Sequence, residues 1–425
     1  MRVVILNQFF YPDHSATSQL MTELAESLVE RGVAVTALAG RGLYNGSKES
    51  LPAQETHKGV RIVRAWSTGF GKRSTPGRVA DYLSFYLGAI WSLLRLPQHD
   101  IVMALTTPPL IGLVALLIGR LRGMRIIALV QDIYPDVAVA LGALRADVPT
   151  TRLFDWLNRL VLSRSDRVIV LGECMRSRVL EKIGVEASDR IDVIHNWADG
   201  ALIESGQSRA QNPFALEHEL HQRFVVMFSG NFGLVNEFGT VLEAARVLRE
   251  RTDIVFLFLG DGVKRVELEQ YVERHQLTNI RLFPYQSRAM LPHSLAAGSV
   301  QLVTLAEGLA GLSVPSKTYG ILAAGKPILF VGDAKSGVAE LICQHECGAV
   351  IPSGDSVRLA AVLEEWAGDN DKVEAMGVAA RQLFEARFDR PQAVTSYLQT
   401  FRHCLNLSPD SNQTSNPVVA RRSVS

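Results

Sequence analysis

The chain has 425 residues, too many for one ordinary hydrophobic core, and this length predicts two or three domains. Hydrophobic residues make up 47% and charged residues 20% of the sequence, which is typical of a globular protein. The 44 basic and 43 acidic side chains nearly cancel. No strong net charge favours a nucleic acid as partner, so we expect none.

Four scattered cysteines do not form a disulfide framework, and we expect a reducing cytoplasm. Cys343, His345 and Cys347 form a short C-x-H-x-C cluster, but no second ligand pair lies nearby and the spacing is not that of a zinc ribbon. We therefore expect no metal and no cofactor. The first residues become polar too early for a signal peptide, and no apolar run reaches the roughly 20 residues that span a bilayer.

In the first half of the chain, predicted strands alternate with predicted helices. RVVILN at residues 2–7 predicts a buried strand, and the helix after it repeats Leu20, Leu24 and Leu28 before Gly32 ends it. Later segments are predicted strands at 33–40, 101–105, 125–130 and 167–171, and a predicted helix at 151–163. This alternation predicts a parallel sheet with helices on both faces.

A polar, turn-rich segment at 197–222 interrupts the pattern, and a second alternating set follows it. Its predicted strands lie at 224–230, 253–260, 280–285, 300–305 and 328–332, and its predicted helices at 240–251 and 263–275. The fold class expected is therefore α/β, with two doubly wound domains. We place their bounds at 1–196 and 223–388, with 197–222 as the linker.

The end of the chain predicts one more helix and a tail. Residues 389–405 are expected to be helical, with Asp389 near the cap and Pro391 in the first turn. Residues 406–425 are polar, and we expect this tail to be disordered.

Loops after strands are the expected ligand sites, because two open parallel sheets turn their carboxyl edges toward a common crevice. SGNFG at 229–233 has two glycines, Gly230 and Gly233, that would let the backbone approach a ligand beside Asn231, although a plain strand-to-helix turn fits as well. In GDGVKR, Lys264 opens a predicted helix, where a cation is unfavourable unless an anion is bound; a solvated lysine is the alternative.

The third loop, GLSVPSKTYG at 311–320, combines small residues with a helix start. Gly311 and Ser313 precede the helix, Ser316 lies in its first turn, and Lys317 follows at once. Unpaired N–H groups and the positive end of the helix dipole predict a phosphate site here.

Taken in order, SGNFG, FLFLGDGVKR, FPYQSRAML and GLSVPSKTYGILAAGKPIL resemble the donor domain of GT-B glycosyltransferases of family four, retaining enzymes that build bacterial surface polysaccharides. In the first half, FYPDHSATSQLMTELAESLVERG, VQDIYPD, VIVLGECM and VIHNWAD resemble the acceptor domain of its O-antigen and capsule amino-sugar branch. The resemblance covers roughly residues 1–400. It implies two Rossmann-like domains that face a central cleft.

The sequence also departs from this family. Two glutamates that most members carry, the second of them binding ribose, are replaced by Leu312 and Gly320, and Glu307 could substitute for the first only if the loop is rearranged. The sequence therefore predicts no residue that binds the ribose of the nucleotide. The usual Arg and Lys after the first strand of the donor domain fall near Asn231 and Asn236.

Pyrophosphate charge must then be met mainly by Lys264, Lys317 and backbone N–H groups. The departures admit a branch-specific donor pocket or lost catalysis. We favour the first, because PSKTYG is itself associated with the amino-sugar branch and a lysine at a helix start has little purpose in an inactive protein.

The acceptor side is expected in the first half. Asp132 follows a strand, and in the family the matching position carries an acidic or histidine group near the reacting hydroxyl. Asp136 lies four residues on and is explained almost equally well as a helix cap. Thr17 and Ser18, in place of the family's double-glycine loop, are expected to face the cleft or simply to begin a helix. His195 and its neighbours are interpreted as hinge and packing residues.

Residues 72–96 join Lys72, Arg73 and Arg78 to an aromatic-rich apolar helix. This pattern suits peripheral docking on the inner face of the plasma membrane, and a core helix after a basic loop fits equally well.

The resemblance implies a retaining glycosyltransferase of the hexosyltransferase type. It would move an N-acetylated amino sugar from a UDP-linked donor to a lipid-pyrophosphate-linked saccharide in O-antigen, capsule or exopolysaccharide synthesis. Asp132, Lys264 and Lys317 are the expected catalytic residues. The alternatives are a nucleotide-sugar epimerase or phosphorylase of the same fold, and a catalytically silent nucleotide-sugar-binding scaffold.

Overall fold

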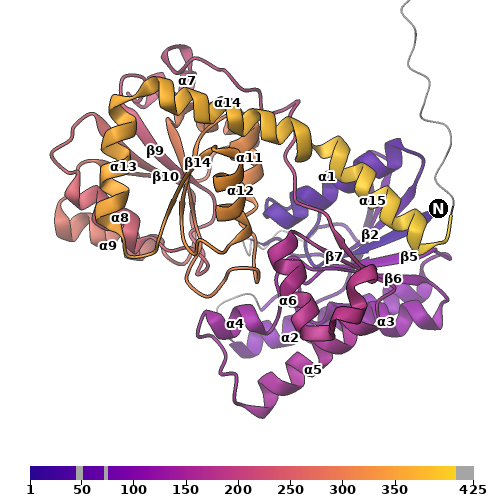
Figure 1. Ribbon diagram of the computed structural model, residues 1–425. Coiled ribbons are helices and arrows are strands. Elements are labelled where there is room, and N and C mark those ends of the chain that lie inside the picture. The colour runs from indigo at the N-terminus through magenta and orange to yellow at the C-terminus, as the bar shows by residue number, and fades with distance from the viewer. Residues whose placement is uncertain (45–50, 71–74, 408–425) are drawn as a thin grey trace, which may run out of the picture.

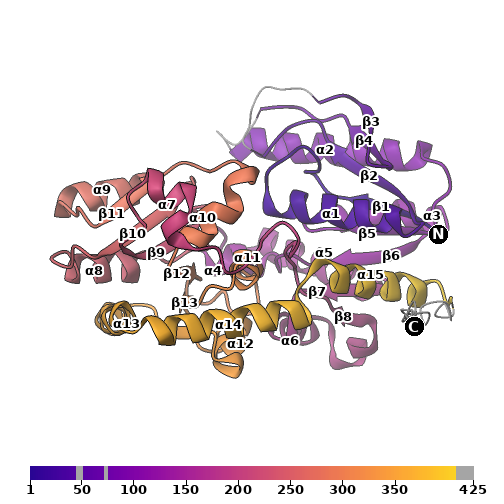
Figure 2. The ribbon, with the colours of Figure 1, turned by 90° about the horizontal axis from the view of Figure 1, so that it is seen from above.

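The computed structural model describes residues 1–44, 51–70 and 75–407 (Figure 1). Lys72 and Arg73, and all but the first two residues of the expected tail, lie outside these ranges. The chain forms two α/β units, each built on its own sheet (Figures 1 and 2). Two doubly wound domains are therefore confirmed.

In the described part of the chain, the N-terminal sheet has eight strands in the order β3-β4-β2-β1-β5-β6-β7-β8. All neighbouring pairs are parallel except the edge pair of β3 and β4. The strands are β1 (Arg2–Leu6), β2 (Ala34–Gly40), β3 (Gln54–His57), β4 (Val60–Ala65), β5 (Ile101–Ala104), β6 (Arg125–Leu129), β7 (Arg167–Val170) and β8 (Ile191–Val193).

Helices cover both faces of this sheet. Val3 and Ile5 of β1 pack in the core that includes Leu24 of α1, whereas Val4 and Leu6 point to the other face. That second face meets the buried sides of α2 and α3. The helical segments are α1 (Ala16–Glu30), α2 (Thr75–Arg95), α3 (Ile111–Leu121), α4 (Asp136–Ala140), α5 (Pro149–Arg164), α6 (Glu173–Ile183) and the 3₁₀ segment η1 (Val185–Arg190).

The C-terminal sheet, as far as the structure describes it, has six parallel strands in the order β11-β10-β9-β12-β13-β14. In both sheets, strands are added first on one side of a central strand and later on its other side. The strand order therefore reverses between β1 and β5 and between β9 and β12, and these are the topological switch points. The strands are β9 (Phe224–Ser229), β10 (Ile254–Leu259), β11 (Ile280–Phe283), β12 (Val300–Thr304), β13 (Ile328–Val331) and β14 (Gly348–Ile351).

The segment expected as a linker is partly helical. It contains η2 (Arg209–Gln211) and α7 (Pro213–Glu217), and Phe214 of α7 is fully buried, because α7 packs against α10. The remaining helical segments are α8 (Gly239–Val247), α9 (Arg265–His275), η3 (Arg288–Met290), α10 (Leu291–Ala297), α11 (Lys317–Ala323), α12 (Gly337–His345), α13 (Ser356–Gly368), α14 (Asn370–Arg387) and α15 (Arg390–Cys404).

Helix α15 returns to the N-terminal domain, as Figure 1 shows. Asp389 caps it in a capping box and Pro391 lies in its first turn, which confirms the predicted helix start. The Thr400 hydroxyl donates to Asp192 of the N-terminal sheet at 3.1 Å. Tyr397 packs edge-on against Trp197, whose indole N–H donates to Glu23 of α1 at 3.2 Å.

We expect Tyr397→Ala to lower the free energy of unfolding by about 3–5 kcal/mol, because it removes a fully buried ring from the contact between α15 and the N-terminal domain. Urea unfolding followed by circular dichroism measures the change. Gln399→Ala on the exposed side of α15 is the control. Equal stability of the two variants would contradict the packing role of α15.

Candidate active site

Loops from the two sheets meet through backbone contacts. The Ile133 N–H, beyond the end of β6, donates to the Leu312 carbonyl at 3.0 Å, and Asp132 and Ser313 form an antiparallel bridge. The Ser313 hydroxyl also donates to the Asp132 carboxylate. The structure therefore brings together Asp132 and Ser313, which the sequence had assigned to opposite domains.

Burial raises the pKa of the Asp132 carboxyl, and the hydrogen bond from Ser313 opposes this shift. Two phenols that were not identified from the sequence share its surroundings. Burial, and then the charges of Asp13 and Asp132, raise the pKa of Tyr44, and burial and Asp132 also raise the pKa of Tyr134. Both tyrosines follow strands, and this position was the signal that could have identified them.

Lys317 is the first residue of α11 and Ser316 is its N-cap, so the helix begins after Ser316, whereas the sequence predicted Ser316 in its first turn. Its Nζ lies 3.1 Å from the centroid of the Phe228 ring. Although the residue as a whole is partly exposed, Nζ itself is buried and has no hydrogen-bond partner among the described residues. Burial lowers the pKa of Lys317 well below its ordinary value of 10.5.

Gly311 lets the chain pass close to the other domain, whereas Gly230 is favoured by its backbone conformation and would still have room for a Cβ beside Lys317. A Cβ on Gly230, whose φ is +135°, would lie 3.5 Å from Lys317 Nζ. Gly311 has a φ of +75°, and a Cβ there would lie 2.8 Å from the carbonyl oxygen of Cys174 in α6. Glycine at 311 therefore allows the loop before α11 to rest on the N-terminal domain.

The start of α11 offers fewer unpaired N–H groups than the sequence suggested. The Ser313 N–H bonds to the Leu309 carbonyl at 3.3 Å, and the Thr318 N–H bonds to the Pro315 carbonyl at 3.2 Å. An anion at this place would depend more on the Lys317 ammonium than on a backbone cradle.

Lys264 occupies the N-cap position of α9 without a capping hydrogen bond from its side chain, and its Nζ donates to the Asn236 carbonyl at 2.6 Å. Asn236 in turn donates from Nδ2 to the carbonyls of Asn231 (3.0 Å) and Gly233 (3.3 Å). Thr304 of β12 donates to its Oδ1 at 3.1 Å. Asn236 therefore fixes the loop after β9, a role that was not foreseen from the sequence, and Lys264 and Lys317 contact opposite ends of that loop.

Asp136 does not share the contact between Asp132 and Ser313 and pairs with another residue. It begins α4 without capping the helix through its side chain, and its carboxylate lies 2.7 Å from Nζ of Lys182. Lys182 also pairs with Asp155 of α5. Asp136 is thus part of an ion-pair group that joins α4, α5 and α6.

Thr17 and Ser18 lie in the first turn of α1, and Ser18 is fully buried. The residue that orders this turn, Asp13, was not identified from the sequence. Its buried carboxylate accepts from the Ser15 N–H at 2.7 Å and from the Tyr44 N–H at 2.5 Å. Asp13 therefore joins the loops that follow β1 and β2.

Several buried polar atoms near the strand ends have no partner within the ranges that the structure describes. Buried polar groups are normally paired, so such a group calls for an explanation, and a bound ligand is one. They follow β1, β5, β6 and β12 and belong to Ser15, Ser18, Thr106, Gln131, Lys317 and Thr318.

The expected substitute for the missing glutamates does not reach this site. Glu307 is exposed in a turn, while Leu312 is buried and Gly320 lies within α11. Among the described residues, no group of three or more His, Cys, Asp or Glu side chains is arranged to hold a metal ion. None of the described helices combines the length and apolarity that a membrane crossing needs.

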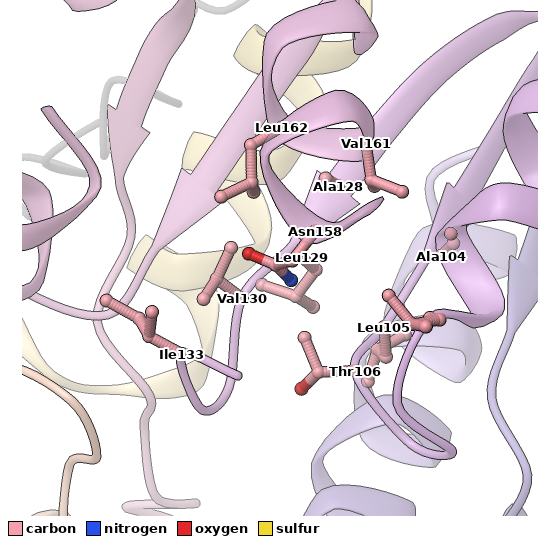
Figure 3. Close-up of a pocket in the computed structure, with 12 residues that line it drawn as sticks. Ala104, Leu105, Thr106, Ala128, Leu129, Val130, Ile133, Asn158, Val161 and Leu162 are labelled. Carbon is pink, nitrogen blue, oxygen red and sulfur yellow. The ribbon is translucent and has the colours of Figure 1, made fainter. Parts of the chain in front are cut away.

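An apolar pocket of about 20 Å³ lies behind the loops after β5 and β6 (Figure 3). Its lining includes Leu105, Val130, Ile133 and Leu162, and it has room for about one water molecule. Because a sugar ring is much larger, the loops that join the two domains remain the candidate site.

The charge of Lys317 predicts a pH dependence of stability. At pH values between the lowered pKa of Lys317 in the folded chain and its ordinary pKa of 10.5, Lys317 is protonated in the unfolded chain and neutral in the folded chain. The contribution of Lys317 to the free energy of unfolding therefore rises with pH. We expect wild type to gain stability over Lys317→Met from pH 7 to pH 9 in urea unfolding. Burial also lowers the pKa of Lys326, to about 8. Because Lys326 is present in both proteins, its effect on stability cancels when wild type is compared with Lys317→Met. Parallel pH profiles would contradict the burial of this ammonium.

Two families match the chain along most of its length. Residues 16–197 match the family described as "Glycosyl transferase 4-like domain", and residues 192–383 match "Glycosyl transferases group 1". The chain is 30% identical over 287 residues to the "Probable glycosyltransferase WbjE" of Pseudomonas aeruginosa, covering 68% of this chain and 71% of that protein. It is 24% identical to the "Putative colanic acid biosynthesis glycosyl transferase WcaI" of Escherichia coli K12, covering 80% and 86%.

Solved structures share the fold. Sucrose-phosphate synthase from Thermosynechococcus elongatus superposes with a TM-score of 0.78 at 14% identity, covering 96% of this chain and 99% of that one. HepE from Anabaena, in complex with UDP and glucose, gives 0.71 at 15% identity, covering 96% and 100%. Both halves match glycosyltransferase families, and a relative that is 30% identical covers 68% of the chain. The chain therefore belongs to the glycosyl transferase group 1 family of GT-B glycosyltransferases.

Proposed function

We propose that this glycosyltransferase moves a sugar from a UDP-linked donor to a lipid-pyrophosphate-linked saccharide in bacterial surface polysaccharide synthesis. The buried Nζ of Lys317 supports this proposal, because it lies over the Phe228 ring and has no hydrogen-bond partner in the described structure. An unpaired ammonium in a low-dielectric site is costly, and an anionic ligand would supply the missing charge. The pyrophosphate of a nucleotide sugar is such an anion.

In the proposed complex, Lys317 holds the donor diphosphate beside the loop after β9. Lys264 and Asn236 keep that loop in shape, so Lys264 acts on the donor through the loop as well as by its charge. As the nucleotide diphosphate leaves, negative charge grows on its oxygens. A positioned cation that stabilises this charge is a major catalytic contribution.

On the acceptor side, we assign Asp132 to the acceptor hydroxyl. Its carboxylate, held by Ser313, lies where the two domains meet. We propose that the reaction retains the anomeric configuration by a front-side path, in which the departing phosphate receives the acceptor proton. Asp132 would then orient the hydroxyl, and a strong protein base is not needed.

Similar proteins support UDP as the nucleotide and a polysaccharide as the product. HepE was solved in complex with UDP and glucose, which supports UDP as the nucleotide. WcaI is described as a putative glycosyl transferase of colanic acid biosynthesis, which supports a polysaccharide product. The PSKTYG segment supports an N-acetylated amino sugar. We place the protein on the inner face of the plasma membrane, where α2 within residues 72–96 would contact lipid.

Nucleotide binding is tested by thermal unfolding with UDP, GDP, ADP and CMP in turn. We expect UDP alone, at 100 times its dissociation constant, to stabilise the protein by about 2.7 kcal/mol. Lys317→Ala should lose this stabilisation and about 10²-fold or more in turnover. Lys335→Ala, an exposed lysine of the same domain, is the control. Normal turnover in Lys317→Ala would remove Lys317 from the mechanism.

The anomeric outcome separates the two roles of Asp132. We expect NMR of the product to show the donor's configuration, and Asp132→Asn to slow transfer while UDP still stabilises the variant. An inverted product, with transfer nearly abolished in Asp132→Asn, would instead make Asp132 a general base.

A catalytically silent nucleotide-sugar-binding scaffold is the second candidate function. Leu312 and Gly320, in place of the family's two glutamates, favour it. Stabilisation by UDP without turnover, across a broad panel of lipid-linked acceptors, would establish this function instead of transfer.

A further inference from the structure

Helix α2 carries a row of large exposed apolar side chains on the side opposite its buried face. They recur about every four residues and include Leu87, 66% exposed, and Trp91, 57% exposed; the others are Val79, Leu83 and Leu94. The opposite side, with Phe85, Ala89 and Leu93, is completely buried against the sheet. A helix that is apolar on both sides has a second apolar surface to cover.

The row continues on the two neighbouring helices. Leu117 and Leu121 of α3 and Leu153 and Trp156 of α5 are also more than half exposed. Helix α3 contacts both α2 and α5. The three helices lie side by side on one side of the N-terminal sheet (Figure 1). We call the exposed apolar side chains of α2, α3 and α5 the three-helix face.

The tryptophans are divided between this region and the core. Trp91 and Trp156 lie on the three-helix face, and the exposed Trp66 lies beside α2, because a Cβ on Gly88 would be 2.3 Å from its carbonyl oxygen. The remaining two of the five tryptophans, Trp197 and Trp366, are buried. Tryptophan is enriched where a protein meets the headgroup level of a bilayer.

The charges of the three helices are strongly one-sided. They contain six exposed arginines, Arg78, Arg95, Arg120, Arg152, Arg159 and Arg164, and two aspartates. Asp81 accepts from the Thr68 hydroxyl and the Phe70 N–H, and Asp155 pairs with Arg159 and Lys182. Excess positive charge around an apolar surface complements anionic lipid headgroups.

The three-helix face adjoins the loops assigned to the acceptor. The Tyr86 hydroxyl of α2 donates to the Pro109 carbonyl in the loop between β5 and α3. Phe154 of α5 stacks on Tyr134, two residues after Asp132, with ring centroids 6.1 Å apart. A bilayer against this face would therefore hold a lipid-linked substrate near Asp132.

We propose that the three-helix face docks on an anionic lipid bilayer, with Trp66, Trp91 and Trp156 at the headgroup level. This goes beyond the contact of α2 alone by adding α3 and α5 and by fixing the side of the N-terminal domain that meets the lipid. It rests on the proposed function only in the use of a lipid-linked acceptor, since docking requires neither donor nor transfer.

The test is co-sedimentation of the full chain with vesicles of phosphatidylcholine alone or mixed with phosphatidylglycerol. We expect binding to the anionic vesicles that weakens with salt, and a loss of about tenfold or more in Leu87→Glu/Leu121→Glu. Val357→Glu/Val378→Glu, which changes two exposed valines of the C-terminal domain, is the matched control and should bind like wild type. Circular dichroism of each variant checks its fold.

Wild type that stays in the supernatant, or a Leu87→Glu/Leu121→Glu variant that still sediments, would overturn the docking. A wild-type dimer that becomes monomeric in this variant, seen by sedimentation velocity without lipid, would make the face an interface between two copies instead. Stabilisation by UDP is measured on the same samples. If UDP still stabilises the protein while vesicle binding fails, only the docking proposal is rejected. If UDP does not stabilise the protein, the result counts against the proposed donor site.

Discussion

Parallel strand pairing is the constraint on which the rest of this structure depends. Because parallel strands end at the same sheet edge, each domain collects its post-strand loops on one side. The chain then needs only one contact between two such edges to assemble a site. The bonds from Ile133 to Leu312 and from Ser313 to Asp132 make this contact. Residues separated by about half of the chain therefore act in one place.

The loop before α11, which makes this contact, leads to a lysine whose amino group has no hydrogen-bond partner in the described structure. The Lys317 ammonium is buried over the Phe228 ring, and burial favours its neutral form. The surrounding sheets and helices must tolerate this cost, and proteins accept such costs mainly where function needs them. An anion that binds beside Lys317 would make protonation of Lys317 favourable again, so binding of the anion and uptake of a proton by Lys317 would be coupled.

Much of the fold could be predicted from the sequence, because most strands are buried apolar runs and most helices repeat apolar residues. The sequence analysis did not predict edge strand β3, because QETH is short and polar, or α7, because its five residues show no periodicity. It also did not predict β4, β8 and β14. In the candidate site, the sequence proposed Lys264 and Lys317 from their positions at helix starts and Asp132 from its position after a strand. The ion pair between Asp136 and Lys182 was not predictable, because it forms only when α4, α5 and α6 pack together. The loop-fixing role of Asn236 depends in the same way on tertiary contacts.

The return of α15 places the second crossing of the chain between the two domains beside the first. The chain crosses between them near Ala198 and again near Asp389, and these two residues pair side by side, with the Arg390 N–H bonded to the Ala198 carbonyl at 3.1 Å. Two crossings at one place let one domain rotate against the other without breaking either sheet. Opening for substrate entry and closing for chemistry can therefore be a rigid-body swing, with α15 travelling as part of the N-terminal domain.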